Sequence, residues 1–190
     1  MTTTSPTATT PAITPAVPLT QALEQARALD PVVSAVRPFG NWFASEPTRR
    51  DLLQGAWLGH ALHPLMTDAP IGLFASALTL DVLGGTSARP AARRLIGLGV
   101  LSSVPTFWTG WAEWAELGQR DQRVGVVHAV ANGTAAFGFL ASWRARRRGQ
   151  HLKGVALGFA SAGLLTVGGY LGGHLVSARK ASTRHPAFDD

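Results

Sequence analysis

Four apolar stretches of about 20 residues, separated by short polar blocks, constrain this chain more than any other feature. They cover residues 65–83, 95–114, 124–143 and 154–176. A helix of about 20 residues is long enough to cross the roughly 30 Å hydrocarbon core of a bilayer. Residues 95–112 and 154–173 show no polar face of the kind that a soluble helix presents to water. The pattern predicts an all-α protein, an integral membrane four-helix bundle.

Charged residues are scarce and grouped. They make up 15% of the chain, whereas 46% is hydrophobic, and a typical soluble domain is about 25% charged. The net charge of +6 comes from arginines that flank the apolar stretches, which favours a membrane over nucleic acid as the contact. The chain has no cysteine, which excludes disulfides, a thiolate nucleophile and cysteine-ligated iron–sulfur or zinc sites.

The region before the first stretch is different in character. Residues 1–20 are rich in Thr, Pro and Ala, so a disordered tail is predicted. Residues 21–64 show short helical periodicities, and we expect an amphipathic segment on the membrane surface. Within it, 38–47 is expected to be a loop, followed by a helix capped by Asp51 or Thr48.

The connections between the stretches differ in charge. The first and third carry most of the basic residues: Arg89, Arg93, Arg94, Arg144, Arg146, Arg147, Arg148 and Lys153. The positive-inside rule therefore places these connections in the cytoplasm, in the inner membrane of a bacterial cell, with both termini outside. Residues 179–190 are expected to be a polar tail.

Polar and ionisable residues collect at the outer end of the predicted bundle. They are His60, His63, Asp68, Glu113, His128, Asn132, Tyr170 and His174. Such residues within membrane spans are costly and mark functional sites. Asp81 is the exception, since it lies at the opposite end, where we expect it to face lipid headgroups or Arg89.

Four motifs occur in order along the chain: GxWLGHALHPLMTDAPIGL, PTxxTGWAEW, RVGVVHAVxN and GGYLGGHLV. Together, over about residues 50–178, they resemble the DUF2231 family, bacterial four-span membrane proteins of unknown function. Members typically read GHPLHP, so Ala61 is a departure. Some relatives continue into a Rieske iron–sulfur domain, which a chain without cysteine does not contain. The resemblance implies a membrane role beside an electron-transfer partner such as a Rieske protein.

Imidazoles on facing helices are suitable axial ligands for haem, and they also bind zinc, iron or copper. The pair expected to hold haem b or a metal ion is His128 with His174, and His63 is the next candidate. Around them, second-shell or alternative ligands are expected: His60, Asp68, Glu113, Asn132 and Tyr170. Trp108, Trp111 and Trp114 are interpreted as an interfacial aromatic belt.

Three hypotheses for function remain open. The first is a redox or cofactor-binding membrane protein, the second a structural or accessory subunit without a cofactor, and the third a proton or small-solute transporter. Ser76 and Ser161 lie at mid-span, far from the histidines, and no nucleophile-elbow motif occurs, so the residues do not favour a hydrolase. Glycines at four-residue spacing allow close helix packing, and a homo-oligomer is a further expectation.

Overall fold

The computed structural model describes residues 16–182, and this part of the chain is helical and holds no β-strand. The helices are α1 (Ala16–Gln25), α2 (Asp30–Ala44), α3 (Pro47–Gln54), α4 (Leu62–Leu83), α5 (Arg89–Ala115), α6 (Gln119–Arg147) and α7 (His151–Gly173). Short helical turns are η1 (Arg27–Leu29), η2 (Ala56–Leu58) and η3 (His174–Ala178). The predicted all-α fold is confirmed. Of the tail predicted to be disordered, 1–15 lies outside the described residues, and 16–20 begins α1.

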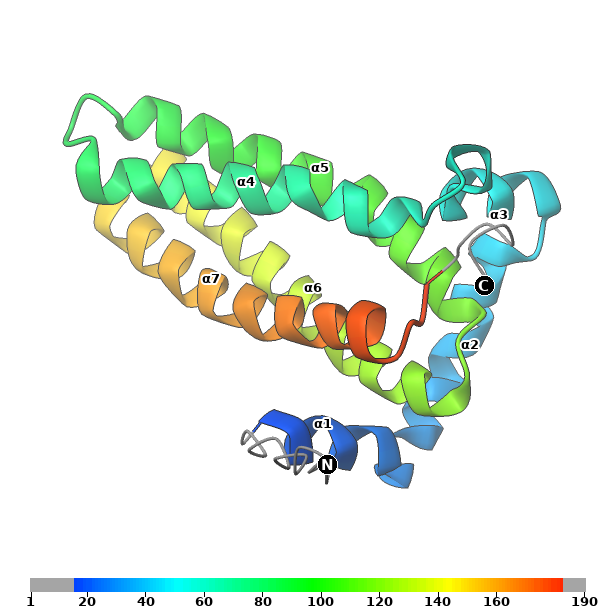
Figure 1. Cartoon of the computed structure of the whole chain (residues 1–190). Coiled ribbons are helices and arrows are strands. Elements are labelled where there is room, and N and C mark those ends of the chain that lie inside the picture. Colours follow the sequence, from blue (N-terminus) through cyan, green and yellow to red (C-terminus); the bar gives the residue numbers. More distant parts are fainter. Residues whose placement is uncertain (1–15, 183–190) are drawn as a thin grey trace, which may run out of the picture.

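Helices α4 to α7 form a bundle in which consecutive helices run antiparallel (Figure 1). The connections between them are short, which makes consecutive helices direct neighbours. The loop end of the bundle, at 84–88 and 148–150, holds the arginine-rich connections. The opposite end, which we call the outer end, holds the start of α4, the α5–α6 connection and the end of α7.

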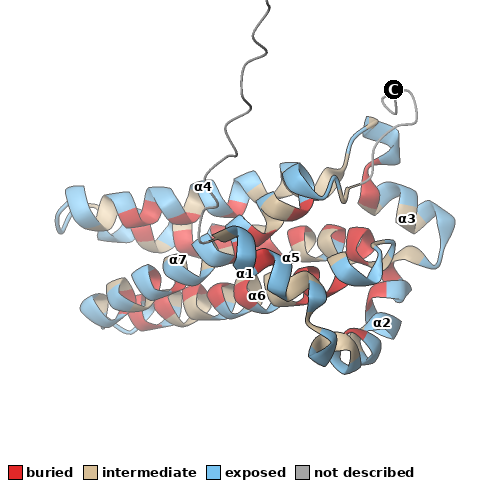
Figure 2. Cartoon of the chain, turned by 60° about the horizontal axis from the view of Figure 1, so that its bottom comes forward, coloured by how far each residue is buried: buried red, intermediate tan, exposed pale blue. Residues whose placement is uncertain are grey.

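The outer surface of the bundle is apolar. Large apolar side chains are exposed on all four helices: Leu65, Ile71, Leu101, Phe137, Phe159 and Val167. Figure 2 shows buried residues as a stripe along the inner face of the helices, with exposed residues turned outward. Since water would penalise such a surface, it fits a membrane environment.

Three helical segments are long and apolar enough to cross a bilayer: Leu62–Leu83, Gln119–Arg147 and His151–Ala178. The predicted count of four spans is therefore not met in full. Helix α5 has 27 residues, but Ser103, Thr106 and Thr109 lower its hydropathy. These three side chains are buried inside the bundle, so the polarity of α5 faces its neighbours and not its surroundings.

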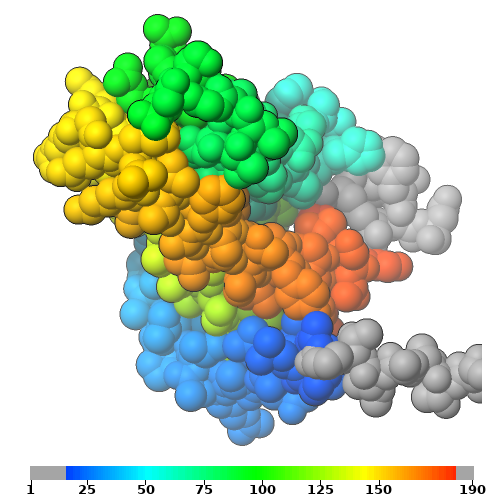
Figure 3. Space-filling view, turned by 90° about the vertical axis from the view of Figure 1, so that its left-hand side faces the viewer, coloured from blue at the N-terminus to red at the C-terminus, as the bar shows by residue number. Residues whose placement is uncertain are grey.

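The N-terminal helices α1 and α2 pack against one side of the bundle near its outer end. Figure 3, seen from the loop end, shows this segment below α6 and α7. The guanidinium of Arg123 donates two hydrogen bonds to the carboxylate of Asp30, at 2.6 and 2.9 Å. Val33 of α2 is fully buried against Trp114 and Val126. The N-terminal segment is thus fixed by both a charged and an apolar contact.

Two local predictions in this segment were wrong. The loop expected at 38–47 is mostly helical, because α2 continues through Pro38 to Ala44. Helix α3 is capped by neither Asp51 nor Thr48. Glu46 is the cap, since its carboxylate accepts hydrogen bonds from the backbone N–H groups of Thr48 and Arg49 at 3.0 and 2.7 Å. These hydrogen bonds hold the pKa of the Glu46 carboxyl below its ordinary value.

The interior of the bundle joins α4 to α6 across its centre. The rings of Phe74 and Phe139 stack in parallel, with centroids 3.7 Å apart. Nearer the loop end, the carboxylate of Asp81 pairs with the guanidinium of Arg146. The expectation that Asp81 faces headgroups or Arg89 was therefore wrong, because a carboxylate turned inward needs a buried cation as its partner.

The predicted tryptophan belt was also wrong as a unit. Trp108 is half exposed, but Trp114 is buried, and its indole N–H donates to the carbonyl of Gln122 at 3.0 Å. Residues at three-residue spacing follow one side of a helix only approximately. Trp108 therefore faces outward, while Trp114 lies between α5 and α6.

Candidate functional site

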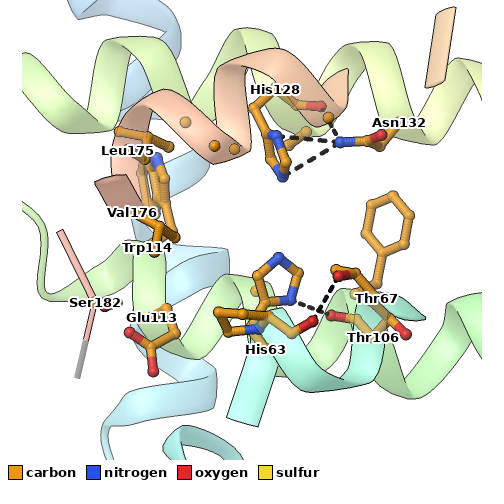
Figure 4. A pocket seen from close by; sticks show the side chains of 18 of the residues that line it. His63, Thr67, Thr106, Glu113, Trp114, His128, Asn132, Leu175, Val176 and Ser182 are labelled. Atoms are coloured by element: carbon orange, nitrogen blue, oxygen red, sulfur yellow. Dashed lines mark hydrogen bonds between the residues drawn. The ribbon is translucent and has the colours of Figure 1, made fainter. Parts of the chain in front are cut away.

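A cavity of about 390 Å³ lies in the outer half of the bundle between α4, α5, α6 and α7. This volume is in the range of small-molecule sites, roughly 300–1,000 Å³. Most of its lining is apolar or glycine, and the polar side chains include His63, Glu113, His128 and Asn132. Figure 4 shows His63 and His128 on opposite walls, with their rings turned toward one another.

His63 projects from the first turn of α4 and is held by α5. Its Nδ1 lies 3.0 Å from the carbonyl oxygen of Thr106 and 3.2 Å from the hydroxyl of Thr109. Since a carbonyl can only accept, Nδ1 carries the proton and donates it, and Nε2 keeps its lone pair. Glycine at position 110 leaves room for the imidazole, because a Cβ there would lie 2.8 Å from Cε1 of the ring.

His128 projects from α6 and is held by α7 in the same manner. Its Nδ1 lies 2.8 Å from the carbonyl oxygen of Gly168, so Nδ1 is again the donor and Nε2 has the free lone pair. A Cβ at Gly172 would lie 2.8 Å from Cε1 of His128. Each imidazole is therefore anchored to a carbonyl and packs on a glycine one helical turn further along the neighbouring helix.

Asn132 supports His128 without consuming its lone pair. Its amide nitrogen donates to the carbonyl of His128 at 3.0 Å and lies 3.2 Å from each of the two ring nitrogens. A donor that is equidistant from both nitrogens lies off the lone-pair direction of each. Gly168 leaves the space for this amide, because a Cβ there would lie 2.6 Å from Cγ of Asn132.

The two imidazoles form a pair across the centre of the bundle. Their ring centroids are 6.2 Å apart and their planes are nearly perpendicular, at 82°. Bonds from an imidazole nitrogen to a metal ion are about 2.0–2.1 Å long, so this separation accommodates one ion between the facing ring edges. The pair is chemically suited to bind one electrophilic centre from two sides.

The bundle has an internal two-fold relationship that places this pair on its axis. The contacts across the bundle repeat at constant offsets in the sequence. We call two residues corresponding when one in α4 lies 65 positions before one in α6, or when one in α5 lies 62 positions before one in α7 or η3. Corresponding residues of α4 and α6 meet at the centre: His63 with His128, Phe74 with Phe139 and Asp81 with Arg146. Corresponding residues of α5 and α7 hold the imidazoles: Thr106 and Gly168, and Gly110 and Gly172. Two similar helical hairpins thus each supply one histidine.

His174 has a different environment from the histidine pair. Its Nε2 lies 2.9 Å from the carboxylate of Glu24 on α1, and Glu24 also pairs with Arg179 at 3.6 Å. His174 is not among the described residues that line the cavity. The structure therefore brings His128 together with His63, while His174 joins the end of α7 to the N-terminal segment.

The remaining candidates divide between the cavity and the surface. Glu113 lines the cavity and is 9% exposed. His60, Asp68 and Tyr170 are exposed. Within residues 16–182, no three His, Asp or Glu side chains converge in a geometry that could hold a metal ion. The two histidines are the ionisable side chains that face one another across the cavity.

Sequence reasoning missed the groups that hold the imidazoles, namely the carbonyls of Thr106 and Gly168 and the glycines at 110 and 172. One signal for the pair itself is present in the sequence. Phe74 follows His63 by eleven residues, and Phe139 follows His128 by the same interval. Equal spacing in two parallel helices indicates corresponding residues.

Comparison with known proteins supports the architecture. No curated protein and no solved structure matched the chain significantly. Residues 59–185, which include α4 to α7 and the histidine pair, match the family described as "Predicted membrane protein (DUF2231)". This match covers well over half of the chain, and the apolar bundle agrees with the description. The chain belongs to the DUF2231 family of membrane proteins.

Proposed function

We propose that this protein binds haem b through His63 and His128 and transfers electrons in the membrane. The observation that carries the proposal is the facing pair itself, with ring centroids 6.2 Å apart and each Nδ1 bonded to a carbonyl of the neighbouring helix. A hydrogen bond at Nδ1 fixes the orientation and tautomer of a ligating imidazole and raises its basicity. Both histidines therefore present Nε2 as the ligating atom.

A site with two histidine ligands suits haem better than it suits a bare metal ion. Protein zinc and copper sites take three or four ligands from side chains, and within the described residues no third ligand of this kind converges on the pair. A haem iron receives four nitrogens from the porphyrin and needs only two axial ligands. Small side chains in the lining, such as those of Ala129 and Ala136, leave room for a flat macrocycle.

The charge of the connections supports one orientation. Arg89, Arg94, Arg147 and Lys153 are exposed at the loop end, which the positive-inside rule assigns to the cytoplasm of a bacterial cell. The histidine pair then lies near the outer face of the inner membrane, with both ends of the described chain on that side. Its redox partner would be an electron-transfer protein at that face, such as the Rieske protein that the family resemblance implies.

The test is the visible spectrum of the protein purified in mild detergent from cells supplied with a haem precursor. The expected result is a Soret band that shifts on reduction with dithionite, with one haem per chain. In the oxidised state, nearly perpendicular imidazole planes should give a highly anisotropic low-spin electron paramagnetic resonance signal. His63→Ala and His128→Ala should each lose this spectrum, whereas His174→Ala should keep it.

Each outcome has a distinct meaning. A folded, colourless wild-type protein from haem-replete cells would overturn the proposal and favour the second candidate, an accessory subunit whose histidines fix the helix arrangement. The buried Asp81–Arg146 pair shows that this bundle does use polar contacts between α4 and α6. Loss of the spectrum in His174→Ala with retention in His63→Ala would identify the originally expected pair, His128 with His174.

A further inference from the structure

The two-fold relationship of the bundle is broken where its two helical hairpins meet. One of the two seams lies between α5 and α6, and the corresponding seam lies between α7 and α4. Aromatic side chains of α5 fill the first seam. A Cβ at Gly125 would lie 2.5 Å from Cδ1 of Trp114, and a Cβ at Gly133 would lie 3.4 Å from Cζ of Phe107. With Trp111 beside them, these side chains close the cavity on the α6 side.

The corresponding positions on α7 carry no aromatic ring. Phe107, Trp111 and Trp114 of α5 correspond to Gly169 and Gly173 of α7 and to Val176 of η3. All six residues line the cavity. A Cβ at Gly169 or Gly173 would meet no atom within 4 Å. Both glycines are exposed, as are Ile71 and Val176. Figure 1 shows α4 and α7 diverging toward the outer end.

The seam between α4 and α7 is therefore open from the cavity to the surroundings of the bundle. Gly169 and Gly173 lie within a membrane-crossing segment, as does Ile71 on the other side of the seam. An opening at this depth faces lipid and not water. We call it the lateral opening and define it by Ile71, Gly169, Gly173 and Val176.

An acidic side chain stands at the edge of the lateral opening. Asp68 is exposed on α4, and its neighbours one helical turn before and after, Pro64 and Ile71, both line the cavity. Residues three and four apart share one face of a helix. A carboxylate within a membrane span is energetically costly, so its presence there points to a function. A site that binds only hydrocarbon chains would gain nothing from this carboxylate.

We infer that the lateral opening admits a lipid-dissolved quinol, whose flat head reaches between α4 and α7 toward the histidine pair while its prenyl tail stays in the bilayer. This inference rests on the proposed haem site for its redox step. One quinol reduces two ferric haem irons, on two protein molecules, to the ferrous state and becomes the quinone. It releases two protons: the Asp68 carboxylate accepts the first from the hydroxyl at the opening, and the second passes to water at the adjacent membrane surface.

The experiment mixes the oxidised haem protein anaerobically with decylubiquinol and follows reduction of the haem band. Gly169→Leu places a side chain in the opening, and Gly163→Leu is the matched control. Gly163 also lies exposed on α7 with no atom within 4 Å of a Cβ, but it does not line the cavity. We expect Gly169→Leu and Asp68→Asn to slow reduction by quinol at least about tenfold. Gly163→Leu should not slow it, and dithionite should reduce all four proteins fully.

A second measurement separates this inference from the haem proposal. Binding of decylubiquinone to the protein, with or without haem, is followed by quenching of tryptophan fluorescence, since Trp111 and Trp114 line the cavity. Quenching that weakens in Gly169→Leu but not in Gly163→Leu would support the opening even in a colourless protein. A haem protein that dithionite reduces but decylubiquinol neither binds nor reduces would overturn the opening alone. Equal behaviour of the two leucine variants would overturn it as well.

Discussion

Asp81 and Arg146 form a two-pronged ion pair inside the bundle, at the end opposite to the histidine pair. Nη1 of Arg146 lies 2.7 Å from Oδ1 of Asp81, and the Nη2–Oδ2 distance is 2.5 Å. The side chain of Asp81 is 1% exposed, and that of Arg146 is 2% exposed. Because they are corresponding residues of α4 and α6, a charge pair stands on the two-fold axis where a symmetric protein would place two identical side chains.

Removal of one member of this pair should be more harmful than removal of both. Asp81→Asn leaves a buried guanidinium without its counter-charge, for which the expected cost is about 3–5 kcal/mol. The double variant Asp81→Leu with Arg146→Met replaces the pair by apolar side chains of similar size and should be closer to the wild type. Unfolding in detergent micelles by added SDS measures both. A single variant as stable as the double one would contradict this prediction.

Gly110 and Gly172, on which the imidazoles pack, should respond alike to replacement by alanine. In Gly110→Ala and Gly172→Ala the new methyl group would lie 2.8 Å from Cε1 of the corresponding histidine, so the imidazole must move, at a cost of about 1–3 kcal/mol. Gly163→Ala meets no atom within 4 Å and should stabilise its helix by up to about 1 kcal/mol. SDS unfolding checks the stability, and haem occupancy checks whether each imidazole keeps its position.

The sequence predicted the bundle because apolar length is a property of each helix alone. It also placed the histidines at one end, since depth follows from position along a helix. The partner of each histidine was harder to predict, because it depends on how a helix is rotated about its axis. His128 and His174 share a similar predicted depth, but rotation turns His128 inward and His174 toward Glu24. That rotation is set by contacts such as Gly172 against His128, which only the packed bundle reveals.

Asp81 shows a second limit of sequence reasoning. A charged residue near the end of an apolar stretch is usually assigned to the headgroups. Its inward direction depends on Arg146, a residue of a distant stretch that itself looks like part of a basic flank. In the sequence, the contact between Asp81 and Arg146 is indicated only by the correspondence between α4 and α6.

His174 should be needed for docking of α1 and not for binding of the proposed haem. His174→Ala removes the contact with Glu24 but leaves Arg123 bonded to Asp30 and to the carbonyl of Glu24. We therefore expect faster trypsin cleavage after Arg27 together with an unchanged haem spectrum. Gln150→Ala, at the loop end, serves as the control. Cleavage at the wild-type rate would show that the His174–Glu24 contact does not hold α1.

The contact of Arg123 with Asp30 should make docking of the N-terminal segment sensitive to acid. The hydrogen bonds from Arg123 hold the pKa of the Asp30 carboxyl below its ordinary value of 3.8. A carboxyl whose pKa is lowered by folding stabilises the folded state above its unfolded pKa, and this contribution is lost as the pH falls through the lowered value. Docking should therefore be constant from pH 7 down to about 5 and weaken below about 4. Hydrogen exchange of amides in α1 and α2 measures this directly. In Asp30→Asn, which cannot titrate, exchange at pH 7 should already be faster and this acid-dependent step should disappear. An equally large step in Asp30→Asn would assign the acid sensitivity to another carboxyl, with Glu24 as the next to test.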